Sequence, residues 1–589
     1  MRSMLSKGLL ALQLLGTSVL AMAAPKVLLV GMDGAQYEKM QALSLPNINR
    51  LQITRSYTGG INGAASQQAT VSGPGWATIL TGVWTSKHTV TSNDSGLADA
   101  RYPSLFKRIR DARPNAYIAS VTHWGSINNQ FFTNDVAGNN FNASNLADQA
   151  VADKVVELVN TTPADFVFAH LDDVDEAGHA SGFGSAYDSA LRAADARLGQ
   201  MLNAVQARQA ANGDDWLVLV TTDHGRDPLL GYNHGNQTQS EKTTFIASSK
   251  AMNAEFSQRI VNVSNQDFSG LYGYAAQTWI APTVLRHLGI EPRADWKLDG
   301  APLTGAVAVR KLLPAQGGQY SFNWFADAVG MIDISRNGEP LASVPALQQG
   351  FLDSAAPKGV VDYTLSVNGT PVSLRLNRNE IQSTLDWDTT RSYFFLTDGS
   401  YVRYNNVLDR AESGYPQAVT EGNWPGLTPY ASKLVGGFSK DASTAYLFLA
   451  DGTYLRYDKT NDKVEAGYPK PINDSTWPGL GSYATQIVAT LRWTGDKVQF
   501  FLRDGRYIRY SLTADHADAG YPKAVNNSSW PGVGNYATKI RAAVKWNDTK
   551  AYFFLNDGSY IRYNISSDKA DAGYPKTVNS STWPGVLSY

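Results

Sequence analysis

The chain has no cysteine among its 589 residues, which excludes disulfide bonds, thiolate metal ligands and cysteine nucleophiles. It also lacks a surplus of either charge, with 51 Lys and Arg against 52 Asp and Glu, so we expect no groove for nucleic acid and no anionic membrane as partner. Histidine is scarce, at eight residues. The chemistry open to this chain is therefore that of carboxylates, hydroxyls and a few imidazoles.

Long hydrophobic runs are also missing, apart from one near the N-terminus. Arg2 and Lys7 precede the apolar run Gly8–Leu20, which is shorter than the roughly 20 residues that a membrane helix needs. A small-x-small cleavage pattern ends at Ala23. We expect residues 1–23 to be a signal peptide, with export to a periplasm or out of the cell and no transmembrane segment after cleavage. An uncleaved anchor is the alternative.

What is present begins with apolar runs rich in β-branched residues, which are typical of buried parallel strands. A long helical pattern, Ser185–Ala211, separates the last two of these runs. Strands that alternate with helices predict a mostly parallel sheet covered on both faces, an α/β/α sandwich over residues 24–310. The predicted strands are Lys26–Val30, Ala116–Val121, Asp165–Leu171 and Trp216–Thr221.

Metal-ligating side chains follow these strands. Ligands of such sheets lie outside the carboxyl ends of the strands, so residues far apart in sequence can converge there. Carboxylates mixed with imidazoles select zinc or a similar transition metal, and two such ions about 4 Å apart would stabilise the attacking and leaving oxygens of a displacement. Taken singly, Asp33 could be only a helix cap and His234 only structural. The candidate ligands are Asp33, Asp175, His179, Asp223, His224 and His234.

The candidate nucleophile is Ser72. The turn Gly73-Pro74-Gly75 and the apolar residues after it predict a helix that begins here, and free N–H groups at a helix start favour an anion. A metal ion on the hydroxyl oxygen would ionise it at neutral pH. Ser72 could instead only cap the helix, and Thr70 is the rival hydroxyl.

Beyond residue 310 the pattern turns to β structure. Tyr363–Val367 and Val372–Leu376 flank Asn368-Gly369, a dipeptide favoured in two-residue hairpin turns. We expect a small β domain or spacer over residues 311–380.

The last 200 residues are an internal repeat. Asp-Gly begins at Asp398 and Asp451, a difference of 53, and recurs at Asp504 and Asp557; Gly-Tyr-Pro and Trp-Pro-Gly keep the same period. Repeats of this size with strands and turns predict a β-propeller with one blade per repeat, hence four blades over residues 381–589. The repeated aromatic residues are interpreted as blade packing.

These repeats resemble hemopexin-type repeats in the pattern Phe-Phe-Leu-x-Asp-Gly-x-Tyr-Ile-Arg-Tyr, followed by Gly-Tyr-Pro and Trp-Pro-Gly. The resemblance implies a four-bladed propeller. Animal members are often closed by a disulfide between the first and last blades, whereas closure here must rest on packing and strand pairing because cysteine is absent. The partner, a protein or a glycan, is not indicated by the fold.

The N-terminal part resembles the alkaline phosphatase superfamily, in particular its type I phosphodiesterase/nucleotide pyrophosphatase branch. The pieces that carry the resemblance are Val30–Gly34, Ser72-Gly73-Pro74, Leu80-Thr81-Gly82 with Lys87-His88, Asp175-x-x-Gly-His179, Thr222–Gly225 and Asn233-His234-Gly235. It implies that Asp175, His179 and His234 hold one zinc ion. It implies that Asp33, Asp223 and His224 hold the other together with Ser72.

The resemblance also implies a two-step mechanism on a small phosphate ester. Ser72 attacks phosphorus, a covalent phospho-serine forms, and water hydrolyses it, while Asn93 donates a hydrogen bond to a non-bridging oxygen. Two departures stand out: the branch often has Thr where Ser72 stands, and Thr89 replaces the Gly usual after the conserved His. Sulfate esters are disfavoured because Trp76 occupies the place of the sulfatases' Arg.

Three functions remain open at this point. The first is an exported two-zinc phosphodiesterase whose propeller docks it to a matrix, glycan or protein. The second is a phosphomonoesterase on the same scaffold, which an additional Lys or Arg near the phosphate would favour; Arg226 is close in sequence to Asp223 but its orientation is not predicted. The third is a binding or adhesion protein with a vestigial catalytic domain.

Overall fold

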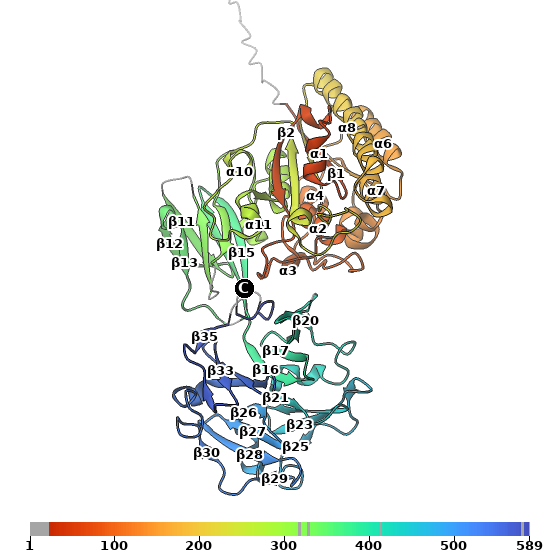
Figure 1. Cartoon of the computed structure of the whole chain (residues 1–589). Helices are drawn as coiled ribbons and strands as arrows, with labels where there is room; N and C mark the ends of the chain where they lie inside the picture. The colour runs from red at the N-terminus through yellow and green to blue at the C-terminus, as the bar shows by residue number, and fades with distance from the viewer. Residues whose placement is uncertain are drawn as a thin grey trace, which may run out of the picture.

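A computed structural model describes residues 23–315, 320–326, 330–357, 359–412, 414–578 and 582–587. The predicted signal peptide, apart from Ala23, lies outside these residues. Figure 1 shows two bodies: one holds the helices and the long sheet together with strands β9–β15, and the other holds the repeats. None of the helices in the described ranges is both long and apolar enough to cross a membrane.

An eight-stranded sheet forms the centre of the first body, in the order β4-β3-β5-β1-β6-β7-β2-β8. Strand β7 runs antiparallel to both of its neighbours, and the other pairs are parallel. All four predicted strands are confirmed, as β1, β3, β5 and β6. The bounds are β1 (Pro25–Met32), β2 (Gln52–Tyr57), β3 (Ile118–Thr122), β4 (Phe141–Ala143), β5 (Phe166–Leu171), β6 (Asp215–Thr221), β7 (Thr243–Ser248) and β8 (Ala275–Ala276).

Helices cover both faces of this sheet, because successive residues of a strand point to opposite sides. Val27 and Leu29 belong to a core with α2, α4 and α12, whereas Leu28 and Val30 belong to a core with α6 and α8. The predicted α/β core is confirmed. The helices are α1 (Tyr37–Ala42), α2 (Ser72–Thr81), α3 (Thr85–His88), α4 (Leu105–Ala112), α5 (Thr133–Val136), α6 (Asp148–Thr161), α7 (Asp173–Ser181), α8 (Ser185–Asn212), α9 (Gln239–Lys242), α10 (Ala254–Ser257), α11 (Asp267–Gly270) and α12 (Ile280–His287).

Two small antiparallel sheets follow. The predicted hairpin is confirmed: β14 and β15 pair with Val367 opposite Thr370, and the turn residues Asn368 and Gly369 have φ of 51° and 76°, the left-handed values that a type I′ turn requires. The strands are β9 (Arg310–Pro314), β10 (Ser321–Phe325), β11 (Met331–Arg336), β12 (Glu339–Pro345), β13 (Gly350–Leu352), β14 (Gly359–Val367) and β15 (Thr370–Arg378).

This β segment lies against the α/β core. Ser373 N donates to Leu298 O over 2.7 Å, and Arg286 Nη2 donates to Thr370 Oγ1 over 3.1 Å. Lys297 Nζ forms an ion pair with Asp362 at 2.9 Å. The segment is therefore bound to the core by several polar contacts.

Each repeat contributes three antiparallel strands with two short strands at the outer edge. The first two repeats form one ten-stranded sheet because β16 pairs in parallel with β21, and each of the last two forms a sheet of five strands. No closed sheet occurs among the described strands of the repeats, so the four-bladed propeller stays a prediction. The strands of the first two repeats are β16 (Ile381–Asp386), β17 (Arg391–Leu396), β18 (Ser400–Asn405), β19 (Arg410–Ala411), β20 (Gln417–Ala418), β21 (Leu434–Ser439), β22 (Thr444–Leu449), β23 (Thr453–Asp458), β24 (Lys463–Val464) and β25 (Lys470–Pro471). Those of the last two are β26 (Ile487–Arg492), β27 (Lys497–Leu502), β28 (Arg506–Ser511), β29 (His516–Ala517), β30 (Lys523–Ala524), β31 (Ile540–Lys545), β32 (Lys550–Leu555), β33 (Ser559–Asn564), β34 (Lys569–Ala570) and β35 (Lys576–Thr577).

Neighbouring repeats are joined by one recurring backbone hydrogen bond. The N–H of an outer-edge strand donates to the carbonyl of the Trp-Pro-Gly proline in the preceding repeat. The first repeat receives its proline from the fourth. The bonds are Val464 to Pro425 at 2.9 Å, Ala517 to Pro478 at 2.9 Å, Ala570 to Pro531 at 2.8 Å and Ala411 to Pro584 at 2.8 Å.

Candidate metal centre

One group of predicted ligands meets where β1 and β6 end. Asp33 follows β1 directly, and Asp223 and His224 follow β6. His224 Nε2 lies 3.2 Å from Asp223 Oδ2 and 3.5 Å from Asp33 Oδ1. All three side chains are buried, and one ligand atom from each lies within 4.8 Å of the others. This spacing is suited to a single cation.

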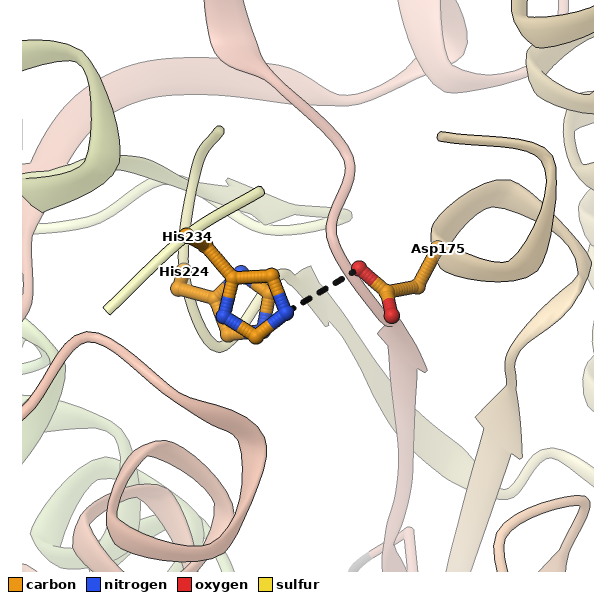
Figure 2. Close-up of side chains that lie close together, drawn as sticks. All are labelled: Asp175, His224 and His234. Atoms are coloured by element: carbon orange, nitrogen blue, oxygen red, sulfur yellow. Dashed lines mark ion pairs between the residues drawn. The ribbon is translucent and has the colours of Figure 1, made fainter. Parts of the chain in front are cut away.

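The second predicted group also comes together. His179 Nε2 lies 3.0 Å from His234 Nε2 and 3.1 Å from Asp175 Oδ2, and His234 Nε2 lies 3.8 Å from Asp175 Oδ1. Figure 2 shows the His224 and His234 rings overlapping and Asp175 facing them from α7; the ring centroids are 3.8 Å apart. His224 is within ligand reach of Asp175 and His234 as well, so it lies between the two groups.

Hydrogen bonds set the tautomers of two imidazoles. His224 Nδ1 lies 2.9 Å from Gly225 O, and His234 Nδ1 lies 3.0 Å from Thr70 O. A carbonyl oxygen can only accept, so each Nδ1 carries the proton and each Nε2 keeps its lone pair. Burial lowers the pKa of both histidines, which favours this neutral form. Metal ligation requires neutral imidazoles held in this way.

Two buried carboxylate oxygens have no hydrogen-bond donor among the described residues, Asp33 Oδ1 and Asp223 Oδ2. Burial raises the pKa of Asp33 to about 8 and holds that of Asp223 well above its ordinary value. Orphaned buried acceptors are costly, and a cation would compensate them. The donor set therefore fits divalent metal ions.

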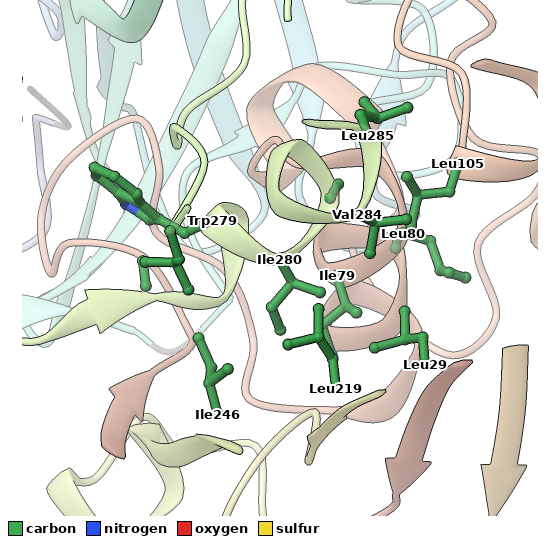
Figure 3. Packing of buried hydrophobic residues seen from close by; sticks show 14 of the residues in the cluster. Leu29, Ile79, Leu80, Leu105, Leu219, Ile246, Trp279, Ile280, Val284 and Leu285 are labelled. Carbon is green, nitrogen blue, oxygen red and sulfur yellow. The ribbon is translucent and has the colours of Figure 1, made fainter. Parts of the chain in front are cut away.

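Ser72 is the first residue of α2, and its Oγ lies 3.3 Å from His224 Nε2. The helix is buried along its whole length; Figure 3 shows Ile79 and Leu80 packed with Ile280 and Val284 of α12 above the sheet. This packing fixes the position of the hydroxyl.

Gly75 lets helix α2 approach the predicted ligand Asp223. A Cβ at this position would lie 2.8 Å from Asp223 Cβ and 2.9 Å from its carbonyl oxygen. Such contacts are too short for any residue with a side chain, so glycine is required for α2 to lie where it does.

The other two candidates of the predicted site lie on either side of Ser72. Asn93 Oδ1 accepts from Gly73 N at 2.7 Å, and among the described residues its Nδ2 has no partner. Thr70 Oγ1 accepts from the N–H groups of Gly235 and Gln237, each at 3.2 Å, so the rival hydroxyl holds the His234 loop. The amide of Asn93 is therefore oriented by the same turn that positions the serine.

The sequence reasoning missed His170 and Asp172 near Asp33, and it considered Trp76 only in relation to sulfatases. Trp76 Nε1 donates to Asp33 Oδ2 over 2.8 Å, and His170 Nε2 lies 3.1 Å from the same oxygen. Asp172 lies within ligand reach of Asp33 and His170. The available signal was a histidine inside the otherwise apolar strand β5, two residues before Asp172.

Arg226, whose orientation the sequence did not predict, points toward Asp175. Its side chain is fully buried, forms an ion pair with Asp175, and donates to Gly231 O and, over 2.9 Å, to Tyr232 O. Although burial acts in the opposite direction, the hydrogen bond with His179 and the charge of Arg226 hold the pKa of Asp175 below its ordinary value. The guanidinium therefore holds the carboxylate of Asp175, a predicted ligand, in place.

The departure at Thr89 has a plain structural reading. Thr89 ends α3 with a φ of 64°, in the left-handed region. A glycine adopts this conformation without strain, and threonine adopts it here too.

A cluster of histidines and carboxylates at the carboxyl ends of a parallel sheet is the arrangement of a metalloenzyme. Residues 125–238 match the model of the Metalloenzyme superfamily, which confirms the resemblance to the alkaline phosphatase superfamily. The chain is also similar, over 143 residues, to interstitial collagenase of Equus caballus at 31% identity and to macrophage metalloelastase of Oryctolagus cuniculus at 25%. These matches fit the C-terminal hemopexin-type repeats.

The chain spans 27% of the length of these relatives, and the match covers 24% of this chain. Solved structures are more distant. An alkaline phosphatase superfamily protein from Vibrio parahaemolyticus shares 12% identity, with 68% of this chain and 83% of that chain covered and a TM-score of 0.35. A 2S albumin seed protein from Dolichos shares 21% identity, with 35% and 96% covered and a TM-score of 0.29.

Proposed function

We propose that the chain is a two-metal phosphoric ester hydrolase that acts on phosphodiesters through a phospho-serine intermediate. The observation that carries this proposal is the convergence of seven predicted side chains around two buried, unpartnered carboxylate oxygens, with the Ser72 hydroxyl 3.3 Å from His224.

The two groups described above would hold one ion each. Asp33, Asp223 and His224 suit the ion beside the nucleophile, and Asp175, His179 and His234 suit the other. Zinc is the expected metal because imidazole nitrogens are mixed with carboxylates. When bound, such ions supply Lewis acidity and neutralise charge on the attacking and leaving oxygens.

The chain itself positions the reacting groups. Helix α2 presents Ser72 Oγ with the N–H groups of the first helical turn beside it, where negative charge is favoured. Ser72 attacks phosphorus, and the bond to the leaving alkoxide breaks. Asn93 Nδ2 is oriented to donate to a non-bridging oxygen of the phosphate. Water then cleaves the phospho-serine and restores the hydroxyl.

A diester is favoured over a monoester by the state of Arg226. A monoester carries an additional negative charge, and a free cation beside the phosphate would favour it. Arg226 is buried and bonded to Asp175, Gly231 and Tyr232, so it offers no such contact. The phosphomonoesterase remains the second candidate because the same nucleophile and metal ligands would serve it.

The test compares bis-p-nitrophenyl phosphate with p-nitrophenyl phosphate, on protein whose zinc content is measured. The expected result is faster hydrolysis of the diester. Ser72→Ala should lower the rate on both esters by about 10³-fold or more, because the rival hydroxyl, Thr70 Oγ1, is bonded to the N–H groups of Gly235 and Gln237.

The matched control is Ser189→Ala, an exposed serine of α8, which should hydrolyse both esters at the normal rate. A Ser72→Ala enzyme with normal activity would overturn the proposed nucleophile. Preference for the monoester would instead favour the second candidate. Protein that binds zinc but hydrolyses neither ester would point to a vestigial catalytic domain.

We also propose the domain plan of an α/β/α catalytic domain over 24–310, a small β domain over 311–380 and a four-bladed propeller over 381–589. The recurring bond between repeats, which includes the one from Ala411 to Pro584, supports a ring of four. Trp424, Trp477 and Trp530 each lie within 5.2 Å of a tyrosine of the next repeat, and Trp583 lies 5.5 Å from Tyr404 of the first. We propose that the propeller docks the exported enzyme to a protein or glycan.

A further inference from the structure

A cavity of about 410 Å³ lies in the repeats, apart from the metal centre. It is lined by the last residue of the first strand in each repeat: Asp386, Ser439, Arg492 and Lys545. These positions are 53 residues apart, so the cavity sits where the four repeats face one another. Its volume is in the range of roughly 300–1,000 Å³ that small-molecule sites occupy.

The four equivalent positions carry four different side chains, an acid, a hydroxyl and two bases. If these four positions only packed the blades together, we would expect the same residue in every repeat, as in the recurring Trp-Pro-Gly. Differences confined to the cavity wall are instead what recognition of an asymmetric small molecule requires.

The acidic residues at the rim are engaged in their own turns. The Asp388 carboxylate accepts from the N–H groups of Thr390 and Arg391, and the Asp441 carboxylate accepts from those of Ser443 and Thr444. Each of these carboxylates is therefore held in its own turn, and Asp388 Oδ2 also accepts from Arg391 Nε over 3.2 Å.

Arg492 is the base with unused donors. Its Nη1 donates to Lys497 O over 3.0 Å, and within the described part of the chain it has no ion-pair partner. By contrast Lys545 is paired with Asp548, and Lys459 Nζ donates to Trp387 O and Ser439 Oγ. A guanidinium with free N–H groups at a cavity wall is suited to a carboxylate or phosphate.

Two indoles complete the lining, Trp387 and Trp546, at equivalent positions of the first and fourth repeats. A flat aromatic surface binds the apolar face of a six-membered ring. The Asp386 carboxylate, which also lines the cavity, can accept from hydroxyl groups at the ring edge. Ser439 Oγ donates to Trp387 O over 3.0 Å and accepts from Lys459, and it can accept one further hydrogen bond from a ring hydroxyl.

We propose that this cavity binds an acidic monosaccharide, a pyranose ring that carries a carboxylate or phosphate group. The anionic group binds to Arg492, and ring hydroxyls bind to Asp386 and Ser439. The ring lies against the Trp546 indole, because Lys459 Nζ lies over the Trp387 ring, 4.7 Å from its centroid. The proposal does not depend on the hydrolase reaction, because none of these residues belongs to the metal centre.

Isothermal titration calorimetry of the full chain tests the proposal with glucuronate, inorganic phosphate and neutral glucose. Glucuronate should bind at least about tenfold more tightly than glucose, since glucose lacks the charge-assisted bonds. Arg492→Gln should weaken the binding of glucuronate by about tenfold or more. Arg506→Gln is the matched control, because Arg506 lies in the same repeat but pairs with Asp504 outside the cavity.

Each result that differs from these expectations overturns a specific part of the proposed binding site. If neither glucuronate nor phosphate binds, or if Arg492→Gln binds like the wild type, the anion site is wrong. Equal binding of glucose and glucuronate also contradicts it. Phosphate binding without glucuronate binding would reject the carboxylate form, and galactose 6-phosphate measured in the Ser72→Ala background would then test the phosphate form. Unchanged melting and diester hydrolysis of Arg492→Gln show that the variant is folded.

Discussion

The two carboxylate oxygens of Asp33 have different surroundings. One carboxylate oxygen receives the indole N–H of Trp76 and lies near His170, and the other has no donor and lies 3.5 Å from His224. A buried carboxylate arranged in this way is unfavourable without a neighbouring cation. Its geometry makes sense as a bridge between a metal ion and the protein that surrounds it.

Metal removal should therefore lower stability as well as activity. Ions that bind only the native state add about 4 kcal/mol when their concentration is 1,000 times Kd. Chelation of the purified protein should lower the melting temperature by several degrees, and added zinc should restore it. Scanning calorimetry with metal analysis measures this, and an identical melting curve for chelated, zinc-free protein would contradict the two-ion centre.

Asp386 should make the stability of the repeats depend on pH. Burial raises its pKa from 3.8 to about 7, although Ser439 N donates to it and Arg492 and Lys459 oppose the shift. The unfolded chain loses this proton near pH 4 and the folded chain near pH 7. The loss of folding stability caused by the buried, ionised Asp386 therefore grows between these pH values and is complete above pH 7.

Asp386→Asn removes that penalty. The variant should be more stable than the wild type by about 1–2 kcal/mol at pH 8, and equally stable at pH 4. This free-energy difference is smaller than the full pKa shift of Asp386 would give, because the side chain borders the open cavity and is partly screened by solvent. Denaturant titrations at the two pH values provide the measurement. A difference of the same size at both would show that the titration of Asp386 is not the cause.

At the scale of elements, β1 and α2 pack closely where Gly31 of β1 meets the ring of Trp76 of α2. A Cβ on Gly31 would lie 2.1 Å from the Trp76 ring. Gly31→Ala should therefore displace the indole that donates to Asp33. Overpacking of this kind costs about 1–3 kcal/mol, and the metal affinity should fall with it.

Calorimetry and zinc titration of Gly31→Ala measure both effects. Gly96→Ala is the control, because a Cβ there meets nothing within 4 Å. Normal zinc affinity in Gly31→Ala would mean that Trp76 does not position Asp33.

The sequence predicted the strands well because their apolar runs are continuous, and it predicted the cluster because strand ends share one edge of the sheet. The sequence could not predict which residues the side chains of Arg226 and Trp76 contact. Arg226 turns away from the expected phosphate position because Asp175, on another element, forms an ion pair with it. The Trp76 contact depends on the rotation of α2 over β1, which tertiary packing sets. Asn93 was reached only through resemblance, since an asparagine in a loop carries no signal of its own.

For the whole molecule, the polar contacts between the two bodies gather at the connecting segment. Asn379 Nδ2 donates to Asp398 over 2.6 Å, Thr397 N donates to Glu380 O over 3.0 Å, and Glu380 pairs with Arg541 at 2.9 Å. By contrast, β14 and β15 are bonded to the α/β core.

A chain that ends at residue 380 should therefore fold and keep its diester activity within about twofold, since its core and metal ligands are complete. A chain that ends at residue 310 should be less stable, because Val372 and Leu313 belong to the same core as α2. Activity assays and melting curves of the two truncations test the domain plan. Loss of activity in the longer one would show that the repeats are part of the catalytic unit.

The hydrogen bond from Ala411 to Pro584 joins residues 173 positions apart (584 − 411), whereas its three counterparts join residues only 39 apart (464 − 425). During synthesis the first repeat therefore emerges long before the residue that completes its edge. Throughout that interval a neighbouring nascent chain can supply its own proline segment instead. Crowded polysomes should accordingly favour intertwined dimers that exchange their final repeats, and faster translation, which shortens the interval, should favour the monomer.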